Sequence, residues 1–395
     1  MKALLLATAA AVMAVPALAD DLTVSPWTGS YDNLTATIGG EAHGAVFGPW
    51  LPKGGPADQR WASGAADLSL KLQRDYDSGL TLALKSSFEV LRDRLSYDNY
   101  GGNLVQKVYA VAQTGLGSLE FGMTDGPGYV LSVTGPVVDE YVSLDNPNTT
   151  FFIDPSTGRP FIEAFNLETE VESSLNYAKF SYYTPRLFGI QIGVSYTPSE
   201  GREVIPFLNN GPHAPNRQKS IWETAVSYSQ QFEDFSLGFY GSAAFGHGDG
   251  KGANDAGLTD WGIGSEIDVP FGEEWKLAVG GSYRHTNTYG FEIYEAQNSA
   301  DTEGAHLSTT LAWNDWTLGG EYSSGTTRTL GEPKLGVRGF GVAAGYRINE
   351  NLQATLGWQE LHYTRDTGTF YDGSQRIAMN ALFLHLTFKV PGSGD

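Results

Sequence analysis

The sequence contains no cysteine, so it can form no disulfide framework and has no thiolate chemistry available to it. After residue 19 it also lacks any run approaching the roughly 18 apolar residues that a transmembrane helix requires. Basic residues are few, and the formal net charge of −20 argues against a surface that binds nucleic-acid phosphates. A disulfide-stapled protein, a helical membrane protein and a nucleic-acid-binding protein are therefore disfavoured.

The residue patterns of catalysis and metal binding are missing as well. None of the seven histidines lies in a His-Glu-x-x-His pattern or at i, i+4 metal spacing, and no Gly-x-Ser-x-Gly elbow appears. The segment GHGDGKG (residues 246–252) lacks the spacing of a phosphate-binding or Ca²⁺-binding loop and is expected to be a surface loop. We therefore expect no enzymatic activity, no cofactor and no metal site.

The first residues present read MKALLLATAAAVMAVPALAD. Lys2 is followed by an apolar stretch and by Ala17-Leu18-Ala19, which has the A-x-A form of a peptidase site. This pattern predicts a secretory signal peptide over residues 1–19 and a single exported domain over residues 20–395.

Glycine is abundant, with 49 residues, and many segments alternate apolar residues with polar or small ones. In FSYYTPRLFGIQIGVSYTP (residues 180–198), Ile190, Ile192 and Val194 alternate with Gln191, Gly193 and Ser195. This period of two predicts strands with one apolar face. That face points inward in a soluble sandwich and toward lipid in a transmembrane barrel.

Sixteen such segments are joined alternately by short turns and long loops. They are 34–47, 62–76, 80–91, 105–113, 118–123, 170–185, 189–197, 219–232, 235–246, 259–271, 275–286, 305–313, 316–326, 337–348, 352–364 and 375–390. An even strand number with short turns at one rim and long loops at the other predicts an all-β, 16-stranded antiparallel transmembrane β-barrel. A soluble exported β-protein is the alternative.

Two further features favour the membrane barrel. Aromatic residues gather beside the short turns, as the membrane–water interface prefers: Phe232, Phe235, Phe271, Trp275, Trp313 and Trp316. Charged residues lie on the polar faces at mid-strand, where a water-filled lumen would solvate them: Lys71, Lys85, Glu266, Glu321 and Arg347.

The segment FSYYTPRLFGIQIGVSYTP (residues 180–198) resembles a segment of the general bacterial porins of Gram-negative outer membranes. VYAVAQTGLGSLEFGMTDGP (residues 108–127) is similar to the porin hairpin that leads into the constriction loop. The resemblance implies a homotrimeric outer-membrane barrel embedded in lipid, in which the third long loop, about 124–169, folds inward. It implies a water-filled channel for passive diffusion of small hydrophilic solutes and ions.

The resemblance also implies that acidic residues of this loop face basic residues of the barrel wall. We expect Asp139, Glu140 and Asp145 on the acidic side, and Lys71 and Lys85 on the basic side of the pore constriction. Family members often carry Arg where this sequence has Gln106 and Met123. Lys107 is expected to face outward.

Two other functions remain open at this point. A channel selective for sugars or small organic anions would bind its solute through lumen residues such as Tyr183, Tyr240 and Arg284. A barrel enzyme or receptor would need a plugged lumen, and the sequence offers no separate plug domain.

Overall fold

The protein is described by a computed structural model that covers residues 24–50, 62–91, 105–145, 167–199, 218–248, 257–287, 300–329, 333–370 and 373–390. The predicted signal peptide lies outside the described residues, and so does the part of the predicted surface loop 246–252 that follows Gly248.

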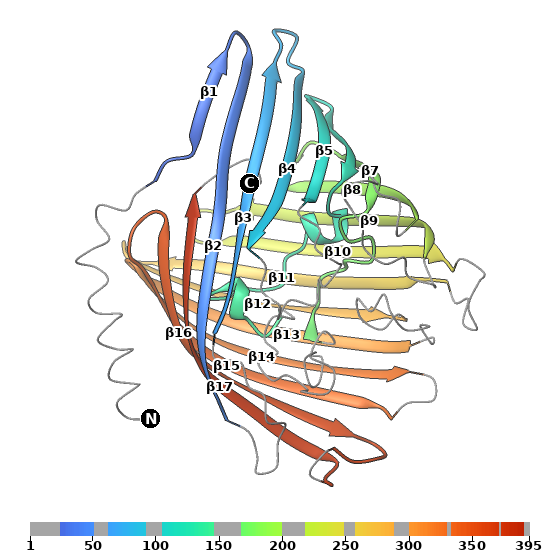
Figure 1. The fold of residues 1–395 in the computed structure, drawn as a ribbon, viewed down its shortest axis with the longest axis vertical. Coiled ribbons are helices and arrows are strands. Elements are labelled where there is room, and N and C mark those ends of the chain that lie inside the picture. Colours follow the sequence, from blue (N-terminus) through green and yellow to red (C-terminus); the bar gives the residue numbers. More distant parts are fainter. Residues whose placement is uncertain are drawn as a thin grey trace.

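Seventeen antiparallel strands form one sheet (Figure 1). They are β1 (Trp27–Tyr31), β2 (Leu34–Trp50), β3 (Ala62–Asp75), β4 (Thr81–Leu91), β5 (Val105–Thr114), β6 (Gly117–Met123), β7 (Ala178–Tyr183), β8 (Ile190–Ser199), β9 (Lys219–Gln231), β10 (Ser236–His247), β11 (Thr259–Phe271), β12 (Trp275–Thr286), β13 (Ala300–Trp313), β14 (Trp316–Thr329), β15 (Leu335–Arg347), β16 (Leu352–Arg365) and β17 (Arg376–Val390).

The sheet closes on itself because the last strand pairs with β2. Asn380–Val390 of β17 lies antiparallel to Gly40–Trp50 of β2 (Figure 1). Strands β2 to β17 therefore form a closed ring of sixteen, which confirms the predicted antiparallel barrel and leaves no unpaired strand edge within the ring. The short β1, which the sequence analysis did not predict, forms a hairpin with the beginning of β2.

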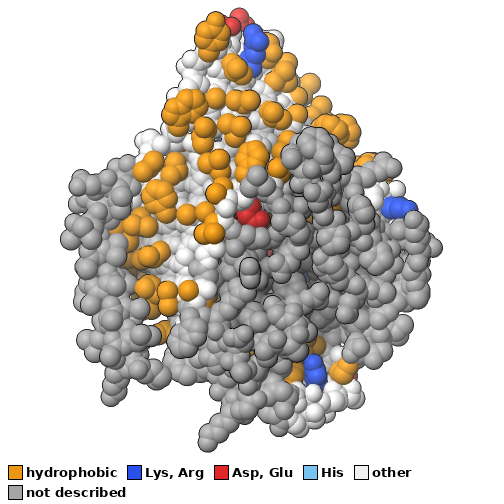
Figure 2. All heavy atoms as spheres, viewed as in Figure 1, with side chains coloured by type: hydrophobic (Ala, Val, Ile, Leu, Met, Phe, Trp, Pro, Cys, Tyr) orange, Lys and Arg blue, Asp and Glu red, His pale blue; other side chains and the backbone are white. Residues whose placement is uncertain are grey.

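The apolar face of the strands points away from the barrel interior. Ile190, Ile192 and Val194 of β8 are exposed, whereas Ser195 of the same strand and Ser181 of β7 are buried. Figure 2 shows hydrophobic side chains over the β1–β4 part of the outer surface. The alternation within residues 180–198 is thus that of a barrel whose outer surface suits lipid.

An aromatic row lies beside the short turns, as predicted. The rings of Trp275 and Trp313 stack with centroids 5.4 Å apart, and Phe271 lies 6.1 Å from Trp275. Ten positions farther along β12, on the same face, His285 pairs with Asp301 at 3.0 Å. Ten residues of a tilted strand rise roughly 25 Å, so the aromatic row and this polar pair are separated by about the height of the apolar band of an outer-membrane barrel.

Two helical turns, α3 (Pro127–Val130) and η1 (Glu140–Val142), lie in the long connection between β6 and β7. Within the described ranges, no helix has both the length and the hydrophobicity to span a membrane.

Candidate functional site

The connection between β6 and β7 lies against the inner faces of distant strands. An ideal Cβ built on Gly264 of β11 would be 1.9 Å from the Val133 carbonyl oxygen. One built on Gly280 of β12 would be 2.7 Å from the Gly135 Cα. Glycine at these wall positions therefore permits the close approach of the loop backbone.

Two buried charged residues hold the root of this loop. Glu223 of β9 accepts hydrogen bonds from the Gly128 amide at 2.7 Å and from the Ser174 hydroxyl at 2.6 Å. Lys179 of β7 donates to the Thr124 carbonyl at 2.5 Å. Because both side chains are almost completely buried, these bonds fix the beginning and the end of the loop against β7 and β9.

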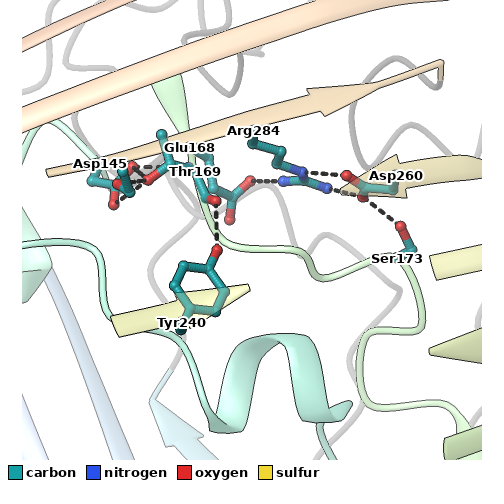
Figure 3. Close-up of polar contacts among 8 residues, drawn as sticks. Asp145, Glu168, Thr169, Ser173, Tyr240, Asp260 and Arg284 are labelled. Atoms are coloured by element: carbon teal, nitrogen blue, oxygen red, sulfur yellow. Dashed lines mark hydrogen bonds and ion pairs between the residues drawn. The ribbon is translucent and has the colours of Figure 1, made fainter. Parts of the chain in front are cut away.

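Arg284 of β12 ties the returning limb of the loop to the wall. Figure 3 shows its guanidinium between two carboxylates, one from the wall and one from the loop. Nε and Nη2 donate to Asp260 of β11 at 3.0 and 2.7 Å, and Nη1 lies 3.6 Å from Glu168. Ser173 also donates to Asp260, at 2.5 Å. The buried arginine is thus paired on both sides, as a charge withdrawn from water requires.

Thr169 joins the two limbs of the loop to each other and to the wall. Its amide and hydroxyl donate to Asp145 at 2.9 and 3.0 Å, and its hydroxyl lies 2.5 Å from that of Ser282 on β12. Tyr240 of β10 donates to the Thr169 carbonyl at 3.1 Å (Figure 3). Both limbs therefore meet at one point of the inner wall.

The carboxyl groups at the point where the two limbs meet lie in a buried setting. Burial raises the pKa of Asp145 and of Glu168 well above their usual values. Burial, reinforced by the nearby Glu170, raises the pKa of Glu172 to about 8, although Arg284 opposes the shift. Burial therefore disfavours the ionised form of these carboxyl groups.

The η1 end of the loop is attached to the opposite part of the wall. Asp139 lies 2.6 Å from His385 Nδ1 on β17, and the Leu144 amide donates to Glu321 of β14 at 2.7 Å. Apolar residues also join here: Val142, Leu144 and Leu167 of the loop pack in one cluster with inner-face residues of β2 and β15–β17 that include Phe47 and Phe383.

The predicted acidic residues differ in their surroundings. Asp139 and Asp145 are buried and bonded to His385 and Thr169, respectively, so both carboxylates hold the loop. Glu140, which begins η1, is exposed.

The predicted basic residues lie together on neighbouring strands. Lys71 of β3 is the direct register partner of Lys85 of β4, and both side chains are half-buried. Lys85 Nζ lies 5.9 Å from the centre of the Tyr109 ring on β5. That these lysines face the loop acids across a pore stays a prediction.

The prediction that Lys107 faces outward is wrong. Tyr109 is the register partner of Lys85 and Lys107 that of Ser87, and such partners share a face in an antiparallel pair. Lys107 therefore lies on the inner face and forms an ion pair with Asp125 at 2.5 Å. Apolar residues occupy both faces of β5, so alternation alone was ambiguous here; the pairing with β4 decides it.

The three residues considered for solute selectivity support the loop instead. Tyr240 and Arg284 bond to loop groups as described above. Tyr183 is buried in a cluster with Leu131 of the loop and Ala225 of β9. Sequence reasoning identified Arg284 as an inner-face residue but could not identify its partners, because Asp260 and Glu168 reach it only through the fold.

Comparisons with known proteins give a consistent assignment. The family model described as Gram-negative porin matches residues 6–366. The fold is similar to Salmonella typhi OmpF in complex with daunomycin (TM-score 0.58, 13% identity, 92% of this chain and 100% of that chain). It is also similar to an anion-selective porin from Comamonas acidovorans (0.54, 13%, 90% and 99%) and to the trimer form of Vibrio cholerae OmpT (0.54, 12%, 91% and 100%). A search of curated proteins found no match.

Proposed function

Because this chain belongs to the Gram-negative porin family and is therefore an outer-membrane channel for passive diffusion, we propose that it is a general pore for small hydrophilic solutes and ions. The selection is by size at a constriction and, weakly, by charge. Catalysis is not part of the proposal, because the family and fold are typical of non-enzymatic channels.

The position of the loop is the observation that supports a constriction. The loop is bonded to or packed against inner faces from β9 to β12 and from β14 to β2, and its root also reaches β5 through Asp125 and Asn176. The remaining passage then lies beside β3 and β4, the strands that carry Lys71 and Lys85. In this proposal the constriction loop is segment 124–169 together with residues up to 177, because β7 begins only at Ala178.

Charges of opposite sign on the two sides of this passage would produce a transverse field that orients polar solutes. Lys71 and Lys85 form the basic side, with Lys107 added near the loop root. On the acidic side, Glu140 is the exposed carboxylate, while Asp139 and Asp145 are buried and contribute mainly by holding the loop in position.

We propose a homotrimer as the working assembly. The support is the likeness of the fold to porins, among them the Vibrio cholerae protein described as a trimer form. Outer-membrane lipid is the expected neighbour of the exposed apolar belt.

Single-channel current in a planar bilayer under a KCl gradient tests the function. We expect large ohmic steps, and we expect the Lys71→Gln/Lys85→Gln double variant to shift the reversal potential toward greater cation preference. Arg347→Gln is the matched control, because Arg347 is an exposed residue at the short-turn rim, paired with Asp315. An absence of conductance from correctly folded protein would refute the pore, and an unchanged reversal potential would refute the role of the two lysines.

A substrate-selective channel for sugars or small organic anions remains the second candidate. It would show saturable, solute-specific block of the ion current, which a general pore lacks. The burial of Tyr183, Tyr240 and Arg284 favours the general pore, because these side chains are engaged with the loop.

A further inference from the structure

Two histidine rings converge where the barrel closes, beside η1 of the loop. His43 lies on β2 and His385 on β17, and the Nδ1 atom of His43 is 3.3 Å from the Nε2 atom of His385. We propose that this pair binds a divalent transition-metal ion such as Zn²⁺ or Cu²⁺, with water completing the coordination. The proposal is independent of solute diffusion.

The distance between the two nitrogens fits a shared ion. Zn²⁺ binds imidazole nitrogen at about 2.0–2.1 Å, so two such ligands on one tetrahedral ion have nitrogens about 3.3 Å apart. The two strands are hydrogen-bonded neighbours, with Thr387 opposite His43 and His385 opposite Ala45. The pair is thus carried by rigid elements, and both rings must turn from their hydrogen-bonded orientation until their lone pairs point at one ion.

The proton arrangement also suits metal binding. With Asp139 as the acceptor at 2.6 Å, His385 donates from Nδ1 and its Nε2 keeps a lone pair. His43 then donates from Nδ1 to that lone pair. When the ion replaces this proton, the proton leaves Nδ1 and His43 stays neutral only by taking up a proton at Nε2, so no net proton is then released.

Asp139 has the place of an outer partner in a carboxylate–histidine–metal arrangement. Such a partner orients the ring and raises its basicity as a ligand. The same carboxylate accepts from the Tyr141 amide at 3.2 Å and so begins η1. An ion bound to His385 would therefore strengthen the attachment of η1 to the wall.

The neighbouring groups define the type of site. The Tyr141 ring centre lies 4.0 Å from that of His43, with the two rings tilted by 42°. Tyr141 also donates to Glu41, whose register partner is Lys389. In the described part of the chain, no cluster of three or more His, Asp or Glu residues forms a ready metal site. We therefore expect an exchangeable site with two protein ligands that is reached past the half-buried His43, because His385 is buried. Imidazole favours Zn²⁺, Cu²⁺ or Ni²⁺ over Ca²⁺ or Mg²⁺.

Calorimetric titration of the folded full-length protein with ZnCl₂ tests the proposal. We expect one site per chain, and we expect His43→Gln and His385→Gln each to weaken binding at least about tenfold. Asp139→Asn should weaken it about 10–100-fold while leaving both ligands in place. His362→Gln is the control, because His362 lies on β16 and pairs with Glu360 at 3.3 Å.

Equal binding in the wild type and both ligand variants, or no binding at millimolar Zn²⁺, would overturn the proposal. If a variant does not fold, the wild type decides by electron paramagnetic resonance with one equivalent of Cu²⁺. Superhyperfine splitting from two nitrogens is expected, and a spectrum of oxygen ligands alone would overturn the site.

Discussion

At the scale of single residues, the inner wall holds buried charges by pairing them across strands and loop. Arg284 is 12% exposed and lies between Asp260, which is fully buried, and Glu168. Replacing it in Arg284→Met would leave two buried carboxylates without their common counter-charge. Breaking a buried pair in this way costs about 3–5 kcal/mol, although protonation of Glu168 would reduce the loss. We expect a lower temperature of barrel unfolding and noisier single-channel current from a loosened loop.

Arg347→Met is the comparison for this prediction. Arg347 pairs with Asp315 at 2.9 Å, but both side chains are more than half exposed, so the loss should be about 0–1 kcal/mol. Equal unfolding temperatures and equal current noise for the two variants would contradict the role assigned to Arg284.

Sequence alternation could identify which face a residue occupies but not what it contacts there. It assigned Lys71, Lys85 and Arg284 to the inner face, and the strand register agrees for all three. It failed for Lys107, because β5 has apolar residues on both faces. Sequence reasoning could not show that Asp139 contacts His385 or that Asp145 bonds to Thr169, since each partner lies more than twenty residues away in the chain.

At the scale of elements, the loop depends on glycines in the wall as much as on polar bonds. A Cβ on Gly264 would collide with the Val133 carbonyl, a backbone atom that can move only with the loop. We expect Gly264→Ala to displace the loop while the barrel folds normally, and single-channel conductance to rise by a measurable fraction.

Gly241→Ala on the adjacent strand β10 is the matched control. A Cβ there would lie 3.8 Å from the Ile263 side chain, an ordinary contact, so conductance should be unchanged. If both variants conduct like the wild type, the loop does not set the width of the passage.

Most strand boundaries follow from local pattern, because a half-lipid, half-water environment imposes alternation along the whole strand. The predicted segments 259–271 and 275–286 match β11 and β12 residue for residue. The predicted strand 170–185 is wrong in its first half, since β7 begins only at Ala178. Residues 170–172 alternate as a strand would, but they belong to the loop limb, where Val171 packs against Ile221 of the wall.

At the scale of the whole molecule, the closure of the sheet into a barrel was predictable from the sequence. The packing of the long loop against the inner wall was not. Sixteen alternating segments with short and long connections lead to a closed ring, because each strand needs a partner on both sides. The apolar cluster of loop residues inside β2 and β15–β17 gives no such signal, since its members come from β2, the β6–β7 loop, β15, β16, the connection after β16, and β17.

Closure and assembly together predict a characteristic response to heat in sodium dodecyl sulfate. Each strand from β2 to β17 is hydrogen-bonded on two sides, so detergent has no edge at which to begin unfolding. Unheated protein should migrate as a trimer, moderate heating should give a compact monomer, and boiling should give the slower unfolded chain. Native mass measurement checks the first species independently of mobility. A compact monomer without any trimer would contradict the assembly and leave the barrel intact. An unfolded mobility before heating would contradict the closed ring itself, because only an open sheet would let the detergent separate its strands at room temperature.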